Sequence, residues 1–279
     1  LEPVRKRPGM YIGSTDNRGL HESLREIIDN SVDESFAGTA SEVWVRVIDD
    51  HTAIVRDNGR GIPVDMHSSG VSALELTMTK LHAGGKFGGG AYKISGGLHG
   101  VGASVVNALS SNFVVVVLRN NKAYYQEYVA GAPKASVAEI TQKKLDDLLP
   151  GKWGIQIGKG VTGTITKFTI DTNIFKDTKL DDNKIKNLLR DRAYLVAGLA
   201  FHFEDERTNE EMHYYFEGGI KTMVAHSNRD KQILTDVIYM QKSDENITAE
   251  IAIQYTDAYT ENLKGYVNGI NTVDGGTHV

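Results

Sequence analysis

The sequence predicts an α+β fold, because two long stretches have a helical period and most other apolar residues fall in short strand patterns. Leu20 to Gly38 repeats apolar residues at spacings of three and four and ends at a glycine, which is typical of one amphipathic helix. Asp181 to Leu199 predicts a second long helix, capped by Asp181 or Asp182. Phe113 to Leu118 is a continuous apolar run, the pattern of a strand buried on both faces.

Shorter patterns predict the other elements. Residues 1–19 carry turn signals and no clear period, so we expect a strap or loop before the first long helix. Strands are predicted at 42–48, 52–56, 123–129 and 162–168, and helices at 71–82 and 101–109. The last part of the chain predicts a helix beginning near Gly218 and strands at 236–241, 248–255 and 263–267.

Length and composition bound the domain count and the compartment. A chain of 279 residues is long enough for two domains. Because the composition turns charged and loop-like between Phe203 and Asn209, we expect one domain at 1–203 and a second, incomplete one at 204–279. The net charge of −5 gives no overall attraction for nucleic acid. The sequence has no cysteine, no apolar run of about 20 residues and no apolar N-terminal segment, so we expect a cytoplasmic protein.

The polar side of the first predicted helix is rich in acids. Arg25 is its one base between residues 20 and 38, and its acids are Glu22, Glu26, Asp29, Asp33 and Glu34. Like charges at helical spacings repel by a few tenths of a kcal/mol each, so a cation bound nearby would explain the pattern; an ordinary solvated acidic face is the alternative. Glu26, Asn30 and Glu34 fall four residues apart at the edge of the apolar face, where side chains can point into a pocket.

A short acidic and glycine-rich segment follows the strand predicted at 52–56. It reads Asp57-Asn58-Gly59-Arg60-Gly61-Ile62-Pro63. A carboxylate at a strand end, followed by two glycines, lets the backbone approach a flat ligand closely. A surface turn is the alternative interpretation, since Asp, Asn and Gly are common turn residues.

Glycines crowd between Gly84 and Gly102, which indicates either a mobile loop or a loop that wraps a ligand. Lys86 is followed by Phe rather than Ser or Thr, and Gly97-x-x-Gly100-x-Gly102 reverses the dinucleotide spacing, so neither a P-loop nor a dinucleotide fingerprint is present. The loop runs into the helix predicted at 101–109, and amides at such a helix start bind phosphate oxygens. Lys86 is a candidate cation for the same phosphates.

Four short boxes occur in order along the chain: Glu26-x-x-x-Asn30, Asp57-x-Gly59-x-Gly61, Gly97-x-x-Gly100-x-Gly102 and Gly163-Thr164. Together they resemble the boxes of the GHKL ATPase superfamily, which includes topoisomerases, chaperones, mismatch-repair proteins and sensor kinases. Longer strings at 5–13, 81–87, 95–106 and 275–278 resemble the ATPase subunits of bacterial type II topoisomerases, namely DNA gyrase B and the ParE subunit of topoisomerase IV. A chaperone or repair relative is disfavoured because the longer strings follow the topoisomerase pattern.

The resemblance, which covers nearly the whole chain, implies a fold. It is the GHKL, or Bergerat, two-layer α+β sandwich, with a mixed, largely antiparallel sheet and helices on one face. Part of a ribosomal-S5-like transducer domain would follow it.

The resemblance also implies the roles of the central site residues. Glu26 corresponds to the general base that polarises the water attacking the γ-phosphate of ATP. Asn30 corresponds to the ligand of Mg²⁺, and Asp57 to the carboxylate that accepts a hydrogen bond from the adenine amino group. Thr164 would support the adenine through its hydroxyl group and a water molecule.

Further ATP-binding residues are implied around these. The base and its surroundings would be lined by Glu34, Arg60, Gly61, Ile62 and Pro63. The lid over sugar and phosphates would contain Lys86, Tyr92, Gly96, Gly97, Leu98, His99, Gly100, Val101 and Gly102. The resembling family binds aminocoumarin antibiotics in the same pocket, for which the implied contacts are Asp57, Arg60, Pro63, Arg119 and Thr164.

The activity implied is that of an ATP-hydrolysing type II DNA topoisomerase, in which ATP-driven dimerisation gates DNA strand passage and changes supercoiling. The implied partners are ATP with Mg²⁺, a second copy of the chain, and, through the full-length protein, DNA and the DNA-cleaving A-type subunit; no membrane partner is expected. The family's N-terminal arm and its transducer lysine have no counterpart in residues 1–279. A nucleotide-gated dimerisation module without turnover is therefore the alternative.

Overall fold

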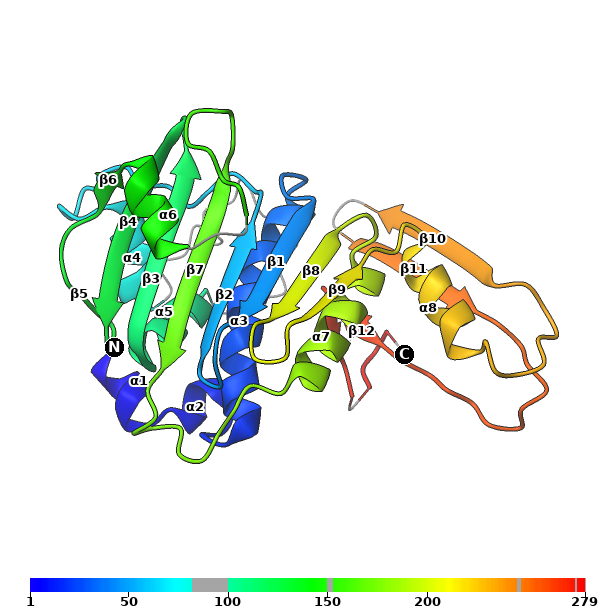
Figure 1. Cartoon of the computed structure of the whole chain (residues 1–279). Coiled ribbons are helices and arrows are strands. Elements are labelled where there is room, and N and C mark those ends of the chain that lie inside the picture. The colour runs from blue at the N-terminus through cyan, green and yellow to red at the C-terminus, as the bar shows by residue number, and fades with distance from the viewer. Residues whose placement is uncertain (82–99, 150–152, 245–246, 274, 279) are drawn as a thin grey trace.

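The computed structural model describes residues 1–81, 100–149, 153–244, 247–273 and 275–278. Its helices are α1 (Glu2–Lys6), α2 (Gly9–Ile12), α3 (Asn17–Phe36), α4 (Ala73–Thr79), α5 (Gly102–Ala108), α6 (Gln142–Leu148), α7 (Asp182–Leu195) and α8 (Gly219–Ser227). Its strands are β1 (Glu42–Val47), β2 (Thr52–Asp57), β3 (Ser110–Arg119), β4 (Lys122–Val129), β5 (Ala132–Pro133), β6 (Ala138–Ile140), β7 (Gly163–Ile170), β8 (Ala200–Asp205), β9 (Glu210–Tyr214), β10 (Ile238–Asp244), β11 (Ile247–Ile253), β12 (Tyr266–Val267) and β13 (Ile270–Asn271). Figure 1 shows a large sheet with helices packed on it and a smaller part that carries α8, β10 and β11.

Within the described residues, the large sheet has nine strands. Their order is β5-β4-β3-β7-β2-β1-β8-β9, with β6 paired to β4. β1 and β8 run parallel, with Val45 opposite Phe203, and the other paired strands of this sheet are antiparallel. The predicted α+β fold with a mixed, largely antiparallel sheet is therefore confirmed.

β3 separates two hydrophobic cores, as its continuous apolar run predicts. Phe113, Val115 and Val117 join the larger core, which α3, α5 and α7 also fill. The alternate residues of the strand join a smaller core together with Leu145 of α6. Figure 1 shows α6 on the face of the sheet opposite α3, α4 and α5, so the main helix layer lies on one face and the short α6 covers part of the other.

α3 buries the apolar stripe that the sequence predicts. Its buried apolar residues are Leu20, Leu24, Ile27, Ile28 and Val32. The helix begins at Asn17 because the side chain of Asp16 accepts a hydrogen bond from the N–H of Arg18 at 2.8 Å. Gly38, two residues after its end, has a φ of +72°, a conformation that glycine adopts without strain. Burying each leucine or isoleucine of the stripe contributes about 1.5–3 kcal/mol.

The expectation of a strap or loop at residues 1–19 is wrong where α1 and α2 form. These helices have five and four residues, too few for a hydrophobic period to be visible. α1 is instead held by tertiary contacts. Val4 is fully buried, and Arg5 donates to the carbonyl oxygen of Ala108 at 2.7 Å and contacts Asp171 at 2.6 Å.

The remaining predicted elements are present with shifted ends, as helix and strand ends usually are. The helix predicted at 71–82 is seven residues long, and the strand predicted at 263–267 is limited to β12. Asp181 caps α7 by accepting a hydrogen bond from the N–H of Lys184 at 3.0 Å. β8 spans residue 203 and β9 pairs with β8, so the large sheet continues past the predicted boundary; the division into two domains stays a prediction.

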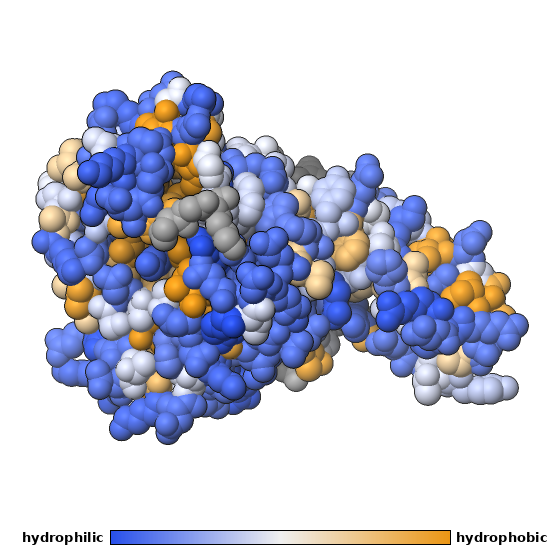
Figure 2. Space-filling model, in the orientation of Figure 1, coloured by the Kyte–Doolittle hydropathy of each residue, from blue (hydrophilic) through white to orange (hydrophobic). Residues whose placement is uncertain are grey.

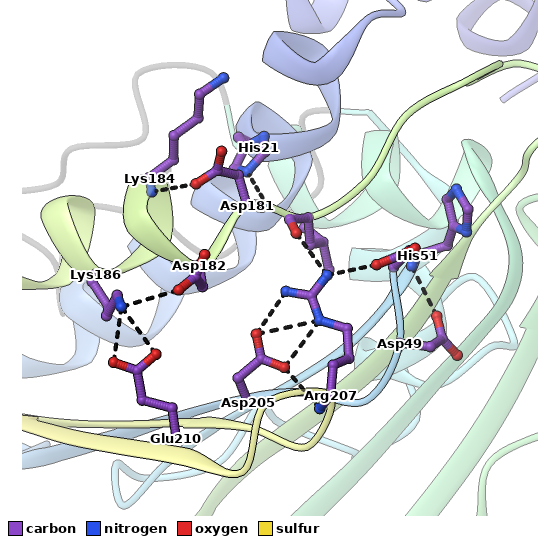
Figure 3. A network of polar contacts seen from close by, with 12 residues as sticks. His21, Asp49, His51, Asp181, Asp182, Lys184, Lys186, Asp205, Arg207 and Glu210 are labelled. Carbon is purple, nitrogen blue, oxygen red and sulfur yellow. Dashed lines mark hydrogen bonds and ion pairs between the residues drawn. The ribbon is translucent and has the colours of Figure 1, made fainter.

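Figure 3 shows a polar network at the end of the sheet where the β1–β2 turn lies. Arg207 binds the fully buried Asp205, the carboxylate of Asp50 at 2.7 Å and the carbonyl oxygen of Leu180 at 2.7 Å. The hydrogen bonds that Arg207 donates to Asp205 are the largest cause that raises the pKa of Arg207. The network therefore holds the β1–β2 turn, the β8–β9 turn and the segment before α7 together.

The part of the molecule around β10 exposes apolar side chains. Figure 2 shows hydrophobic residues along it, and Ile233, Leu234, Ile238 and Met240 are exposed. Among the described residues, no helix has the length and apolar character that crossing a membrane requires.

Candidate functional site

Asp57, the last residue of β2, is the centre of a group of buried polar contacts. The residue is only 3% exposed. Oδ1 accepts hydrogen bonds from the backbone N–H of Gly59 at 2.9 Å and of Thr164 at 3.2 Å. Oδ2 accepts one from the hydroxyl group of Ser31 at 3.1 Å. The carboxylate is thus fixed through one oxygen by the backbone of β7 and of the loop after β2, and its other oxygen faces α3.

The surroundings of Asp57 oppose its ionisation. Burial raises the pKa of Asp57 to about 6, the charge of Glu34 acts in the same direction, and the hydrogen bonds from Gly59, Thr164 and Ser31 lower it in part. A buried carboxyl group with a perturbed pKa is a common mark of a functional site. Its second oxygen is suited to accept a further hydrogen bond from a ligand.

Three glycines around Asp57 let neighbouring parts of the chain approach one another closely. A Cβ atom at Gly163 would lie 2.0 Å from the carbonyl oxygen of Asp57, and one at Gly61 would lie 2.8 Å from the carbonyl oxygen of Leu118. Gly61 and Gly163 also have φ angles of +75° and +139°. A Cβ atom at Gly59 would lie 2.9 Å from the Glu34 side chain. A side chain at any of these positions would therefore collide with neighbouring backbone or with Glu34.

Gly163→Ala is expected to lower the free energy of unfolding by about 2–4 kcal/mol, because it adds a clash to an unfavourable φ. Gly160→Ala is the matched control: its φ is +73°, but nothing lies within 4 Å of an added Cβ, so a loss of about 1 kcal/mol is expected. Urea unfolding of both variants measures the difference. Equal losses in the two variants would contradict a role for close backbone approach at Gly163.

Two arginines hold the loop that follows Asp57. The guanidinium of Arg60 binds Glu34 through Nε at 3.1 Å and Nη2 at 2.9 Å. Arg119, at the end of β3, donates from Nη1 to the carbonyl oxygen of Gly61 at 2.9 Å. The N–H of Ile62 donates to the hydroxyl oxygen of Thr164 at 3.3 Å. The structure therefore brings the predicted site residues Glu34 and Arg60, and likewise Gly61, Ile62, Arg119 and Thr164, into contact. Pro63 follows Ile62 in the chain and is exposed.

Glu26 and Asn30 lie on α3. They precede Ser31 and Glu34, the residues of this helix that contact Asp57 and Arg60. Four residues advance a helix by about 6 Å, so Glu26, Asn30 and Glu34 follow one another along the site. A Cβ atom at Gly102, the first residue of α5, would lie 2.1 Å from Oε2 of Glu26. The carboxylate of Glu26 therefore lies directly against the backbone where the glycine-rich segment enters α5. Gly100, Val101 and Gly102 are half-buried there.

Arginines account for much of the acidic side of α3. Glu22 pairs with Arg25, Glu34 with Arg60, and Asp29 with Arg192 of α7. A bound cation is therefore not needed to explain these three acids. Burial raises the pKa of Glu22, while the charge of Arg25 lowers it.

Six predicted site residues lie outside the described part of the chain, namely Lys86, Tyr92, Gly96, Gly97, Leu98 and His99. The sequence interpretation also missed one residue, Ser31. Its signal was present, since Ser31 is a polar residue beside Val32 on the buried side of the helix. A buried hydroxyl group needs a hydrogen-bond partner, and that partner is Asp57.

Two protein families match this chain. Residues 15–126 match the family described as histidine kinase-, DNA gyrase B- and HSP90-like ATPase. Residues 219–279 match the DNA gyrase B family.

Several curated proteins are similar over the whole chain. DNA gyrase B of Thermotoga maritima is 46% identical over 288 residues, and DNA gyrase B of Staphylococcus epidermidis is 47% identical over 285. The B-type subunit of DNA topoisomerase 4 from Streptococcus pneumoniae is 42% identical over 278 residues. Each alignment covers 100% of this chain but only 41–43% of the relative, so the chain spans less than half the length of these relatives.

A solved structure is similar in fold. It is the 43K ATPase domain of Thermus thermophilus gyrase B in complex with an aminocoumarin. The similarity has a TM-score of 0.84 at 35% sequence identity and covers 99% of this chain and 68% of that one.

Proposed function

The chain belongs to the family of ATPase subunits of bacterial type II DNA topoisomerases, and from this premise we propose that residues 1–279 bind and hydrolyse ATP as part of such a protein. One observation carries the proposal. The buried carboxylate of Asp57 lies in a cradle of glycines, next to the helix that carries Glu26 and Asn30. If the adenine of a bound ATP lay at Asp57, its phosphates would extend along α3 toward Asn30 and Glu26.

Asp57 would recognise the adenine base. Its Oδ2 would accept a hydrogen bond from the adenine amino group, and Ile62 and Pro63 would cover the ring. Guanine has a carbonyl group at the equivalent position, so two acceptors would face each other at a cost of about 1–3 kcal/mol. Thr164 would support the base through its hydroxyl group and a water molecule.

Hydrolysis would depend on α3 and on the segment that enters α5. Glu26 would accept the proton of the attacking water, as a general base. The amide oxygen of Asn30 suits a hard cation such as Mg²⁺, which prefers few protein ligands and phosphate oxygens. Bound Mg²⁺ would neutralise charge that develops on the phosphates. Lys86, Tyr92 and residues 96–102 would close over the nucleotide.

The wider activity is also part of the proposal. ATP binding would join two copies of the protein, and the full-length protein would act on DNA with the DNA-cleaving A-type subunit in the cytoplasm. Aminocoumarins would compete with ATP at Asp57, Arg60, Pro63, Arg119 and Thr164. The solved relative with a bound aminocoumarin supports this part of the proposal.

Titration calorimetry with a non-hydrolysable ATP analogue and its GTP counterpart tests the proposal. With Mg²⁺ present, the adenine analogue is expected to bind at least about tenfold more tightly than the guanine analogue, because of the mismatch at Asp57. Omitting Mg²⁺ is expected to weaken binding of the adenine analogue. Equal affinity for both analogues, or no binding of either, would contradict the proposed pocket.

A further inference from the structure

Arg192, in the last turn of α7, joins two parts of the chain that are distant in sequence. Its side chain is only 8% exposed. Nε donates to Oδ1 of Asp29 at 2.8 Å and Nη2 to Oδ2 at 3.0 Å, while Nη1 donates to the carbonyl oxygen of Gly269 at 2.5 Å. Asp29 precedes Arg192 by 163 residues and Gly269 follows it by 77. One buried guanidinium group therefore binds α3 and the β12–β13 hairpin at the same time.

The α3 end of this contact adjoins the proposed nucleotide site along the helix. Asp29 immediately precedes Asn30 and lies between Glu26 and Glu34 on the same helix. The paired contact uses the planar fork of the guanidinium group, which fixes the orientation of the carboxylate. A change in the rotation or position of α3 around Asn30 must therefore move Arg192 or break the pair.

The other end of the contact lies in a tight hairpin. β12 and β13 are joined by Asn268 and Gly269, whose φ angles are +50° and +78°, as in the two-residue turns that join antiparallel strands. A Cβ atom at Gly269 would lie 3.9 Å from the ring of Phe36, the last residue of α3. Figure 1 shows β12 beside α7. The turn thus binds α7 through Arg192 and lies near the end of α3 at Phe36.

Tyr266 of β12 shares these surroundings. Burial raises the pKa of its phenol group, the charge of Asp191 adds to that effect, and the charge of Arg192 opposes it. The hairpin therefore interacts with the last turn of α7 in two ways. The phenol group of Tyr266 lies in the field of Asp191 and Arg192, and the carbonyl group of Gly269 accepts a hydrogen bond from Arg192.

We propose that Arg192 is a positioning residue that couples the nucleotide site on α3 to the β12–β13 hairpin through its simultaneous contacts with Asp29 and Gly269. The proposal rests on the function proposed above and adds to it a route by which nucleotide binding reaches residues 266–271. Binding beside Asn30 restrains α3, and the Arg192–Asp29 pair transmits that restraint to the carbonyl group of Gly269.

Hydrogen exchange of the hairpin amides, with and without the ATP analogue and Mg²⁺, tests the coupling. In the unchanged chain the analogue is expected to slow exchange at residues 266–272 by at least about fivefold, the lower end of usual coupling factors. In Arg192→Met the change is expected to be less than about twofold, although calorimetry still detects analogue binding. Arg190→Met is the matched control, since Arg190 lies on the same helix, is half exposed and contacts only its neighbour Asp191 among the ion pairs described. It is expected to respond like the unchanged chain.

Asp29→Asn supplies a second, independent variant. It weakens the pair but leaves the contact with Gly269, and its response is expected to fall as well. Combining it with Arg192→Met is expected to cause no further loss, because the two residues act as one unit. If Arg192→Met does not fold, Arg192→Lys keeps the charge without the planar fork and is expected to lose most of the response.

The outcomes separate the two proposals. A response of normal size in folded Arg192→Met, or analogue binding without any hairpin response in the unchanged chain, would overturn the coupling and leave the proposed function intact. Failure of the unchanged chain to bind the analogue would overturn the proposed function and the coupling with it.

Discussion

Glu26→Gln is expected to lower the steady-state rate of ATP hydrolysis by at least about a hundredfold, the usual lower contribution of a positioned general base. Glutamine keeps the shape of the side chain, so its packing against Gly102 at the start of α5 is retained. It has no carboxylate, so it cannot accept the proton of the attacking water. The affinity for the ATP analogue is expected to stay within about threefold, because the change removes an interaction made mainly in the transition state.

A phosphate-release assay measures turnover, and calorimetry measures binding of the analogue to the same samples. Glu22→Gln is the matched control. Glu22 lies one turn earlier on α3, and its carboxylate pairs with Arg25, so turnover is expected to stay within a few fold of the unchanged chain. Normal turnover in Glu26→Gln would exclude Glu26 as the base. If the unchanged chain binds the analogue but shows no turnover, the module that binds without hydrolysis is the better description.

The sequence predicts best those helices and strands whose own pattern of apolar residues determines which side is buried. α3 shows five apolar residues at helical spacing, and all five are buried. β3 is apolar at every position from Phe113 to Leu118 because each of its faces lies in a core. In such segments the local pattern and the tertiary structure agree, and the pattern is enough.

Other features depend on partners far along the chain, which no local pattern reveals. α1 and α2 are too short to show a period, and α1 is held by contacts such as Arg5 with Asp171. The parallel pairing of β1 with β8 joins segments about 160 residues apart, as Trp44 opposite His202 illustrates. The partner of Asp29 was equally hidden, because Arg192 lies on another helix.

The candidate site was predicted through resemblance as much as through local chemistry. Asp57, Gly61 and Thr164 lie in boxes separated in the sequence, and the structure brings them together. The roles of Glu26 and Asn30 stay predictions. Ser31 was missed because a single serine in an amphipathic helix usually indicates no particular function. Its hydrogen bond to the carboxylate of Asp57 explains why it is buried.

Asp57→Asn is expected to weaken binding of the ATP analogue by more than about tenfold, because it turns an acceptor toward the ligand into a donor. The N–H groups of Gly59 and Thr164 both point at Oδ1, so they select the amide oxygen at that position. The amide nitrogen then takes the place of Oδ2, where it still binds Ser31 but faces the adenine amino group as a second donor. The fold is expected to survive, and the loss is expected in binding.

The same carboxyl group makes binding dependent on pH. Only the ionised form accepts the adenine amino group, and burial raises the pKa of Asp57 from 3.8 to about 6. The ionised fraction therefore falls as the pH drops below 6, and at pH 5 affinity is expected to be about tenfold lower than at pH 7.5. The folded chain binds this proton more tightly than the unfolded chain, so Asp57 lowers the free energy of unfolding as the pH rises from about 4 to 6.

Calorimetry of the unchanged chain and of Asp57→Asn from pH 5 to pH 7.5 separates this effect from titration of the ligand. The phosphates of the analogue titrate alike with both chains, so the difference between the two pH profiles isolates Asp57. Near pH 6, binding to the unchanged chain is also expected to release protons, which appears as an enthalpy that depends on the buffer. Parallel profiles without proton release would show that Asp57 is ionised throughout this range. Unchanged affinity in Asp57→Asn would remove Asp57 from base recognition altogether.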